Sequence, residues 1–143
     1  MYLICDIDKT VSKIPLDRAE FARRGEWDSY YACDFSHDEP VTPIVRIVQA
    51  WIDAGGIVMF VTSRREAVRV QTAEWLRTHI DGLEPRNHQL VMRKDSDMTP
   101  ESVWKIREIR ANFPRQNAAL VIDDDPFVCD ILAAIGYKTL QAR

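Results

Sequence analysis

Continuous apolar runs of strand length constrain the fold of this chain more than any other feature. They lie at residues 2–5, 57–61 and 118–122, and none alternates with polar residues, which is typical of strands covered on both faces of a sheet. Helix patterns separate these runs, and two shorter apolar runs complete five strands. The helices are expected at 43–54, 66–79, 99–113 and 126–135, and the short strands at 90–92 and 137–140. This alternation predicts an α/β fold, a Rossmann-like three-layer sandwich with a five-stranded parallel sheet and right-handed crossovers.

Periodicity also predicts which side of each helix is buried. In the third helix, Thr99 is expected to cap the start and Pro100 to occupy the first helical position. The inner sides of the third and fourth helices are expected to be formed by apolar side chains at helical spacing, namely Val103, Ile106, Ile109 and Phe113, then Val128, Ile131, Leu132 and Ile135.

Composition limits the class of protein. The 143 residues suffice for one domain with a core, and contents of 46% hydrophobic and 29% charged residues are ordinary for a globular protein. The net charge of −3 gives no general attraction to nucleic acid or anionic membranes. There is no signal-peptide pattern and no apolar run near the ~18 residues of a membrane span. Three cysteines without metal-ligand spacing indicate reduced thiols. We therefore expect a single cytoplasmic domain over residues 1–143.

The segment between the first strand and the first predicted helix, about residues 11–42, has no regular pattern. It mixes charges, prolines and aromatic residues. Long irregular insertions in compact domains are often lids or binding loops, and this one directly follows the first strand. We expect a small lid over the cleft, with a plain surface excursion containing two short helices as the alternative. Within the lid, Trp27, Tyr30 and Tyr31 are candidates for stacking on a base or, alternatively, for packing the lid onto the body.

Polar side chains follow four of the predicted strands. Asp6 and Asp8 follow the first strand, and the others are Thr62-Ser63-Arg64, Arg93 and Asp123-Asp124. Because the carboxyl ends of parallel strands meet at one edge, these residues are expected to converge on a ligand site. Clustered carboxylates repel one another unless a cation neutralises them, and oxygen ligands favour Mg²⁺. Cations beside such an ion suit a phosphate group.

These motifs resemble those of the haloacid dehalogenase (HAD) superfamily of phosphatases. Asp6-Ile-Asp8-Lys-Thr10 is similar to its D-x-D-x-T motif, Thr62-Ser63-Arg64 to its second motif, Lys105 to its third and Ile122-Asp123-Asp124 to its fourth. The order along the chain matches as well. The resemblance implies a HAD-like domain with only a small cap and Mg²⁺-dependent phosphoryl chemistry.

A closer resemblance is to the 3′-phosphatase domain of phage-type polynucleotide kinases. It rests on Trp27-Asp28, Asp34, Pro40, Pro43, the V-T-S-R segment, Val91-Met92-Arg93 and Lys105. The chain contains no G-x-x-x-x-G-K-[ST] motif, so no kinase domain is expected. The resemblance implies a phosphorylated substrate such as a DNA or RNA 3′ end, a role in nucleic acid repair, and a bacterial or phage-infected host cell.

The resemblance also implies roles for single residues. Asp6 is the expected nucleophile, and Asp8 the acid that protonates the leaving oxygen and later activates water. Thr62 (or Ser63) would donate to a phosphate oxygen, and Lys105 would neutralise the transferring phosphoryl group. The Mg²⁺ ligands would be Asp6, the backbone carbonyl of Asp8, and one of Asp123 and Asp124. The supporting residues are Thr10, Ser63 and Glu101, with Glu101 positioning Lys105.

Substrate binding is assigned to cationic and polar residues near the predicted edge. Arg64 is expected to contact the substrate phosphate, and Arg18, Asp28 and Arg93 are weaker candidates for the rim. Lys9 stands where the relatives usually have glycine, which adds a cation beside the phosphate site, and Glu101 stands where they have aspartate.

Two other functions remain open. One is a HAD phosphatase acting on a free nucleotide or small phosphorylated metabolite. The other, of a different class, is a non-catalytic phosphate-binding or receiver-like module. The sequence fixes neither the substrate nor the oligomeric state.

Overall fold

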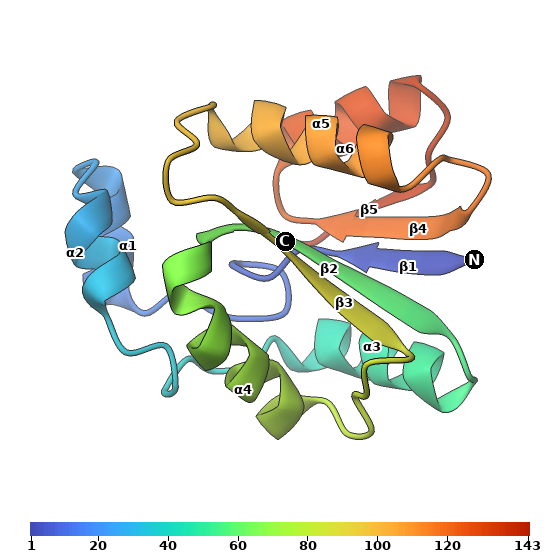
Figure 1. Ribbon diagram of the computed structural model, residues 1–143, viewed down its shortest axis with the longest axis horizontal. Coiled ribbons are helices and arrows are strands. Elements are labelled where there is room, and N and C mark those ends of the chain that lie inside the picture. The colour runs from blue at the N-terminus through green and yellow to red at the C-terminus, as the bar shows by residue number, and fades with distance from the viewer.

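The computed structural model describes residues 1–143 and contains the predicted parallel sheet. Its strands are β1 (Tyr2–Cys5), β2 (Ile57–Arg65), β3 (His88–Arg93), β4 (Ala118–Asp123) and β5 (Thr139–Gln141), in the spatial order β3-β2-β1-β4-β5 (Figure 1). All four pairings are parallel, and Ile4 of the central strand lies opposite Met59 of β2 and Val121 of β4. From β1 the chain first adds β2 and β3 on one side and then β4 and β5 on the other. The change of side occurs next to β1, and open α/β sheets bind ligands at such a point.

Helices cover both faces of the sheet, as the α/β prediction requires. α3 (Thr42–Asp53) and α4 (Arg69–His79) lie on one face, while α5 (Glu101–Asn112) and α6 (Pro126–Ala134) lie on the other (Figure 1). A short 3-10 turn, Glu66–Val68, joins β2 to α4. The longest helices have 12 residues, and none is long and apolar enough to cross a membrane.

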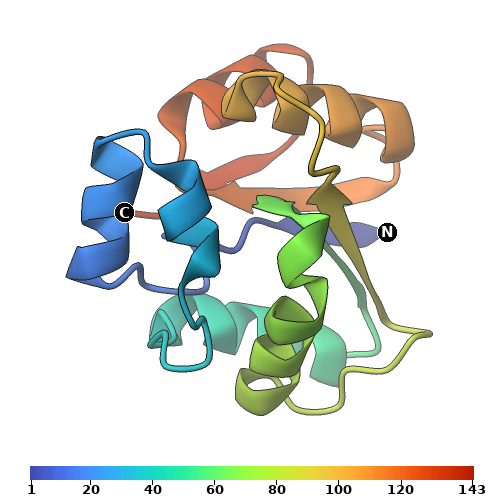
Figure 2. The same cartoon turned by 60° about the vertical axis from the view of Figure 1, so that its left-hand side comes forward.

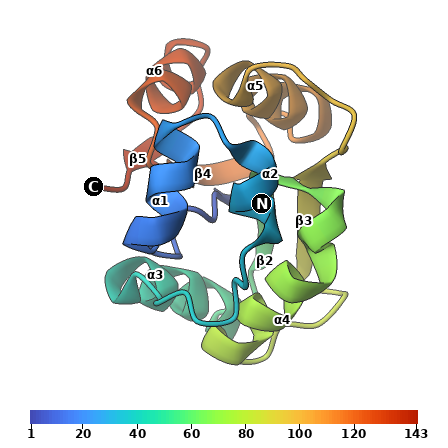
Figure 3. The same cartoon turned by 90° about the vertical axis from the view of Figure 1, so that its left-hand side faces the viewer.

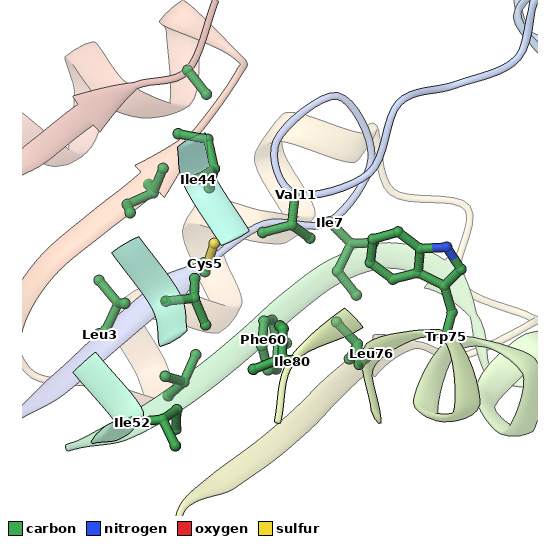
Figure 4. Packing of buried hydrophobic residues seen from close by; sticks show 14 residues of the cluster. Leu3, Cys5, Ile7, Val11, Ile44, Ile52, Phe60, Trp75, Leu76 and Ile80 are labelled. Atoms are coloured by element: carbon green, nitrogen blue, oxygen red, sulfur yellow. The ribbon is translucent and has the colours of Figure 1, made fainter. Parts of the chain in front are cut away.

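Each face of the sheet has its own apolar core. Beneath one face, Leu3 and Cys5 of β1 and Phe60 of β2 pack against Ile44 and Ile52 of α3, together with Trp75 and Leu76 of α4 (Figure 4). On the other face, Ile4, Met59 and Val121 pack against Trp104 and Ile109 of α5 and Leu132 of α6. Burying β1 on both sides fixes the direction in which its last residue leads into Asp6.

The irregular segment forms two helices, α1 (Leu16–Arg23) and α2 (Trp27–Ala32), joined by a turn at Gly25 with a positive φ of 71°. Both helices lie across the carboxyl edge of the sheet, in front of the strand ends (Figures 2 and 3). Tyr30 and Phe35 pack on Val68 and Met92 of the body in a separate small cluster. The segment therefore has the position expected of a lid.

β2 is four residues longer than the predicted strand at 57–61, since it continues to Arg65. Thr62, Ser63 and Arg64 are all buried within it. Their polarity indicated a strand end, but Ser63 and Arg64 find hydrogen-bond partners on the lid, on α4 and α5 and at Asp8, and the Thr62 hydroxyl is bonded within β2.

The inner side of α5 differs from the prediction by one position. Val103 is 49% exposed, whereas Trp104 and Lys105 are buried. The charge of Lys105 argued against burial, but two carboxylates hold it inside. Thr99 makes no side-chain cap; Pro100 occupies the N-cap position, and the helix start has no side-chain cap hydrogen bond.

The inner side of α6 also differs in part. Val128 and Leu132 are buried as predicted, but Ile131 and Ile135 are each 38% exposed and Cys129 is buried instead. The buried stripe of α6 faces β4, β5 and the neighbouring helix α5, and it is narrower than the apolar stripe.

Candidate active site

Asp6 lies at the centre of a buried charge cluster directly after β1. Lys105 Nζ of α5 is 3.0 Å from Asp6 Oδ1 and 2.9 Å from Asp123 Oδ2 at the end of β4. Thr10 Oγ1 donates a hydrogen bond of 2.9 Å to Asp6 Oδ2. All four side chains are buried. The structure thus brings together the first, third and fourth motifs that the sequence analysis singled out.

The pKa values in this cluster reflect two buried carboxylates around one ammonium. Burial and the charge of Asp6 raise the pKa of Asp123, despite the opposing effect of Lys105. Burial alone would lower the pKa of Lys105, but Asp6 and Asp123 outweigh it and raise that pKa. Lys105 is therefore a fixed positive charge beside the candidate nucleophile.

Three carboxylates could hold a metal ion. One oxygen each from Asp6, Asp123 and Asp124 lies within 4.8 Å of the others. Burial and the charge of Asp6 raise the pKa of Asp124 as well, so the three acids repel one another without a further cation. An all-oxygen donor set at a cleft suits Mg²⁺. The next acid, Asp125, is not part of this set of carboxylates; it caps α6 by accepting a hydrogen bond from Phe127 N.

Asp123 and Asp124 differ in how free they are to bind an ion. Asp123 is 1% exposed; its Oδ2 is held by Lys105, and its Oδ1 accepts a hydrogen bond from Asp125 N at 3.0 Å. Asp124 is half-buried and lines the cleft. Because Asp124 is the more accessible of the two acids, the geometry favours it over Asp123 as the direct ligand.

Asp8 belongs to a second charge cluster, on the lid side of the site. Arg64 donates two hydrogen bonds to its carboxylate, from Nε at 2.9 Å and from Nη2 at 2.7 Å. Arg18 of the lid lies 3.6 Å from Asp8 and forms a two-bond pair with Asp38. The centre of the Phe35 ring lies 4.3 Å from the guanidinium carbon of Arg18 and 4.4 Å from that of Arg64.

These contacts determine the ionisation of Asp8. Burial would raise the pKa of Asp8, but the charges of Arg64 and Arg18, with the hydrogen bonds from Arg64, outweigh burial and lower the pKa below its ordinary value. Asp8 is therefore held as a carboxylate, with its side chain 17% exposed toward the cleft.

The expectation that Arg64 and Arg18 face the substrate does not match this geometry. Each is 1% exposed, and neither lines the cleft. Arg64 is also bonded to Thr72 of α4 at 3.2 Å. Both arginines are positioned to hold Asp8 and Asp38, because leaving those buried carboxylates unpaired would be costly.

A cleft of about 540 Å³ opens above the acids, roofed by the lid. Its floor and sides include Asp8, Lys9, Ser63, Glu101, Ser102, Lys105, Asp124, Asp125 and Pro126, and its lid wall includes Ile14, Ala19, Ala22, Arg23, Trp27, Tyr30 and Tyr31. This volume is in the range of sites that enclose a small ligand.

Of the two candidate hydroxyls, Ser63 rather than Thr62 lines this cleft. Ser63 Oγ donates to Glu101 Oε1 at 2.5 Å, and its backbone carbonyl accepts a hydrogen bond from the Tyr31 hydroxyl of the lid. Thr62 is 1% exposed, and its Oγ1 accepts from Arg64 N. Glu101 therefore binds Ser63, whereas the expected pairing of Glu101 with Lys105 is not formed.

The remaining candidates lie around the cleft at different depths. Lys9 is exposed and lines it. Arg93 is half-buried and donates to the carbonyl of Thr99, while Asp28 is fully exposed on α2, 3.7 Å from Arg65. Arg93 and Asp28 do not line the cleft. Their assignment to the substrate rim stays a prediction.

Two residues that hold the site were missed. Asp38 is 3% exposed and pairs with both arginines, and Phe35 is fully buried with its ring in contact with both. The sequence offered only a weak signal, an isolated acid and an aromatic residue within an irregular segment. Their importance depends on the lid folding back onto β2, which no local pattern shows.

Residues 1–143 match the family described as the polynucleotide kinase PNKP phosphatase domain. The chain belongs to this family. The membership confirms the resemblance to HAD phosphatases, so the protein is a phosphoric monoester hydrolase and not a receiver-like module. No curated protein matches the chain.

Solved structures of PNKP-type and acid phosphatases share the fold. A chain of the Pnkp1/Rnl/Hen1 complex is 21% identical with a TM-score of 0.75, over 99% of this chain and 44% of that one. A chain of the Pnkp1/Rnl/Hen1 RNA repair complex is 21% identical with a TM-score of 0.73, and the match covers 98% of this chain and 41% of that one. A class C acid phosphatase from Bacillus anthracis, solved with tungstate bound, is 16% identical with a TM-score of 0.61. This match covers 98% of this chain and 65% of that one. This chain thus spans less than half the length of the two Pnkp1 chains.

Proposed function

We propose that this protein removes the 3′-phosphate from nucleic acid ends or nucleotides, with Mg²⁺ and through an aspartyl-phosphate. The observation that carries the chemistry is the pairing of Asp6 with Lys105, which lines the cleft together with Asp124. A carboxylate nucleophile next to a fixed cation and a candidate metal site is the arrangement that phosphoryl transfer requires.

In the first step, an Asp6 oxygen attacks phosphorus and the bond to the 3′-oxygen breaks, while Asp8, which must first take up a proton from solvent, gives that proton to the 3′-oxygen. In the second step, Asp8 takes a proton from water, whose oxygen attacks the aspartyl-phosphate and releases inorganic phosphate. Arg64 holds Asp8 ionised, which suits the second step. Proton donation in the first step must overcome that ion pair.

Lys105 lies within 3.0 Å of the nucleophile and compensates charge as the phosphoryl group moves onto Asp6. Asp6, Asp124 and the backbone carbonyl of Asp8 would hold Mg²⁺, and Asp123 would keep Lys105 in place. When bound, the ion supplies positive charge to the phosphoryl oxygens and lowers the repulsion among the carboxylates.

The substrate class is supported by family membership and by the shape of the site. The family is that of the phosphatase domain of a polynucleotide kinase, and the fold is shared with a chain of an RNA repair complex. The lid wall offers Trp27, which is 39% exposed, beside Tyr31. Aromatic faces of this kind stack on nucleobases.

The test is phosphate release from 3′-phosphorylated and 5′-phosphorylated oligonucleotides, nucleoside 3′-monophosphates and sugar phosphates, with and without a chelator. We expect turnover of the 3′-phosphorylated compounds, loss with the chelator and recovery with Mg²⁺. Asp6→Asn is the control, because an amide cannot form the covalent intermediate. Turnover restricted to sugar phosphates would contradict the substrate class, and undiminished turnover by Asp6→Asn would contradict the nucleophile.

A further inference from the structure

Three cations line the cleft, and two of them already have carboxylate partners. Lys105 lies between Asp6 and Asp123, and Arg23 pairs with Glu20 of the same helix. The third, Lys9, has an exposed side chain that forms neither an ion pair nor a hydrogen bond. Lys9 is therefore the one cation of the cleft wall without a carboxylate partner.

The backbone at Lys9 is also unusual. Its φ of 63° makes it the only residue other than glycine in the left-handed region. A lysine there is strained relative to glycine, and such strain concentrates at functional sites. The loop keeps this conformation through a hydrogen bond of 2.7 Å from Lys9 N to the carbonyl of Ser12.

The reacting phosphoryl group has other partners. Lys105 contacts Asp6, which itself belongs to the candidate metal site, whereas Lys9 is an exposed residue of the cleft wall. A cleft of about 540 Å³ is in the range that encloses a ligand of about one nucleotide. The next phosphate of a polynucleotide would then lie at the opening, within reach of a flexible lysine side chain.

We infer that Lys9 binds the phosphodiester on the 5′ side of the terminal nucleotide and so favours a polynucleotide end over a mononucleotide. The inference rests on the proposed 3′-phosphatase function. Binding a non-reacting phosphodiester adds affinity only for substrates that have one, so Lys9 acts as a specificity-determining residue.

The experiment compares kcat/KM on a short 3′-phosphorylated oligonucleotide with kcat/KM on the matching nucleoside 3′-monophosphate, for the full chain. We expect Lys9→Gln and Lys9→Gly to lower the ratio of the two by about fivefold to tenfold, the effect of one exposed charge-assisted contact. Lys9→Arg should retain most of the ratio. Lys13→Gln is the matched control, since Lys13 is an exposed lysine of the same loop that pairs with Glu39 outside the cleft.

A neutral methylphosphonate in place of the terminal phosphodiester gives an independent measurement. It should lower kcat/KM of the unaltered protein and have much less effect on Lys9→Gln. Equal losses on both substrates, or an unchanged ratio, would overturn the inference, because Lys9 would then act on the reacting phosphoryl group or on nothing. If Lys9→Gly kept the ratio and Lys9→Gln lost it, side-chain bulk would explain the effect and the inference would be wrong. Failure of the unaltered protein on both 3′-phosphorylated substrates, with activity on sugar phosphates, would instead reject the proposed function.

Discussion

Arg64 offers the sharpest test of the structure, because sequence and geometry assign it different tasks. The sequence favours a contact with substrate phosphate, whereas the structure buries Arg64 against Asp8, Thr72 and Phe35. Arg64→Met keeps an unbranched side chain but removes the charge and three hydrogen bonds. If Arg64 is part of a buried ion-pair cluster, the substitution must lower the free energy of unfolding even without substrate.

The size of the loss follows from the partners left behind. Removing one member of a buried ion pair costs about 3–5 kcal/mol. Asp8 remains 17% exposed and keeps Arg18 at 3.6 Å, so we expect the lower end, about 3 kcal/mol. For a domain of this size the melting temperature should fall by roughly 6–12 °C. Arg65→Met is the matched control, since Arg65 pairs loosely with exposed Asp28 and should cost at most about 1 kcal/mol.

Urea unfolding of both variants, with Asp8→Asn to complete a double-mutant cycle, measures these differences. We expect a coupling free energy of about 1–3 kcal/mol between positions 64 and 8. The pKa of Asp8 is lowered in the folded state, so its stabilising effect is present above its unfolded pKa of about 3.9 and is lost as the pH falls through the lower folded value. Arg64→Met should therefore lose less stability than the unaltered protein on acidification across this window. If Arg64→Met lost activity but unfolded like the unaltered protein, the structural role would be refuted and the substrate role restored.

Three further predictions follow from strain, charge and burial. Lys9→Gly should raise the free energy of unfolding by about 0.5–1 kcal/mol in urea titrations, because relief of the left-handed strain exceeds the added flexibility of the unfolded chain; a destabilised variant would contradict the strain. Lys105→Met should lower the free energy of unfolding by about 3–5 kcal/mol, since Asp6 and Asp123 lose their cation. Mg²⁺ should restore part of this loss, and an equal loss with and without Mg²⁺ would argue against the metal site. Iodoacetamide should modify Cys33 rapidly and the two buried cysteines only on unfolding, as peptide mass spectrometry can measure; fast labelling of all three would contradict their burial.

The parts of the structure that the sequence predicted are those fixed by local patterns. An apolar run followed by acids indicates both a buried strand and the place where it ends, so Asp6, Asp8 and Asp123 were assigned to one edge of the sheet. Lys105 followed from its motif, although its charge hid the fact that it lies on the buried side of α5. Helix periodicity describes apolar side chains well, but it cannot show that carboxylates from other elements will neutralise a lysine.

The partners of Arg64 could not be predicted for a related reason. Every residue of β2 from Val58 to Arg64 is buried, so alternation along the strand does not reveal which side chains face the cleft. Ser63 lines the cleft, while Arg64 points toward Asp8 and α4. That choice depends on Asp38, which reaches the site only after the lid has folded.

The two catalytic candidates of the D-x-D motif therefore have separate charge partners. Asp6 is neutralised from α5 by Lys105, entirely within the body of the domain. Asp8 is held by Arg64 of β2 and by Arg18 of the lid, and both of these arginines depend on Asp38 of the lid. Displacing the lid would remove Arg18 and Asp38 together and leave Asp8 with Arg64 alone. The lid thus does more than cover the cleft, because it supplies part of the charge that fixes the ionisation and position of the candidate acid–base residue, while the nucleophile keeps its own cation whether the lid is docked or not.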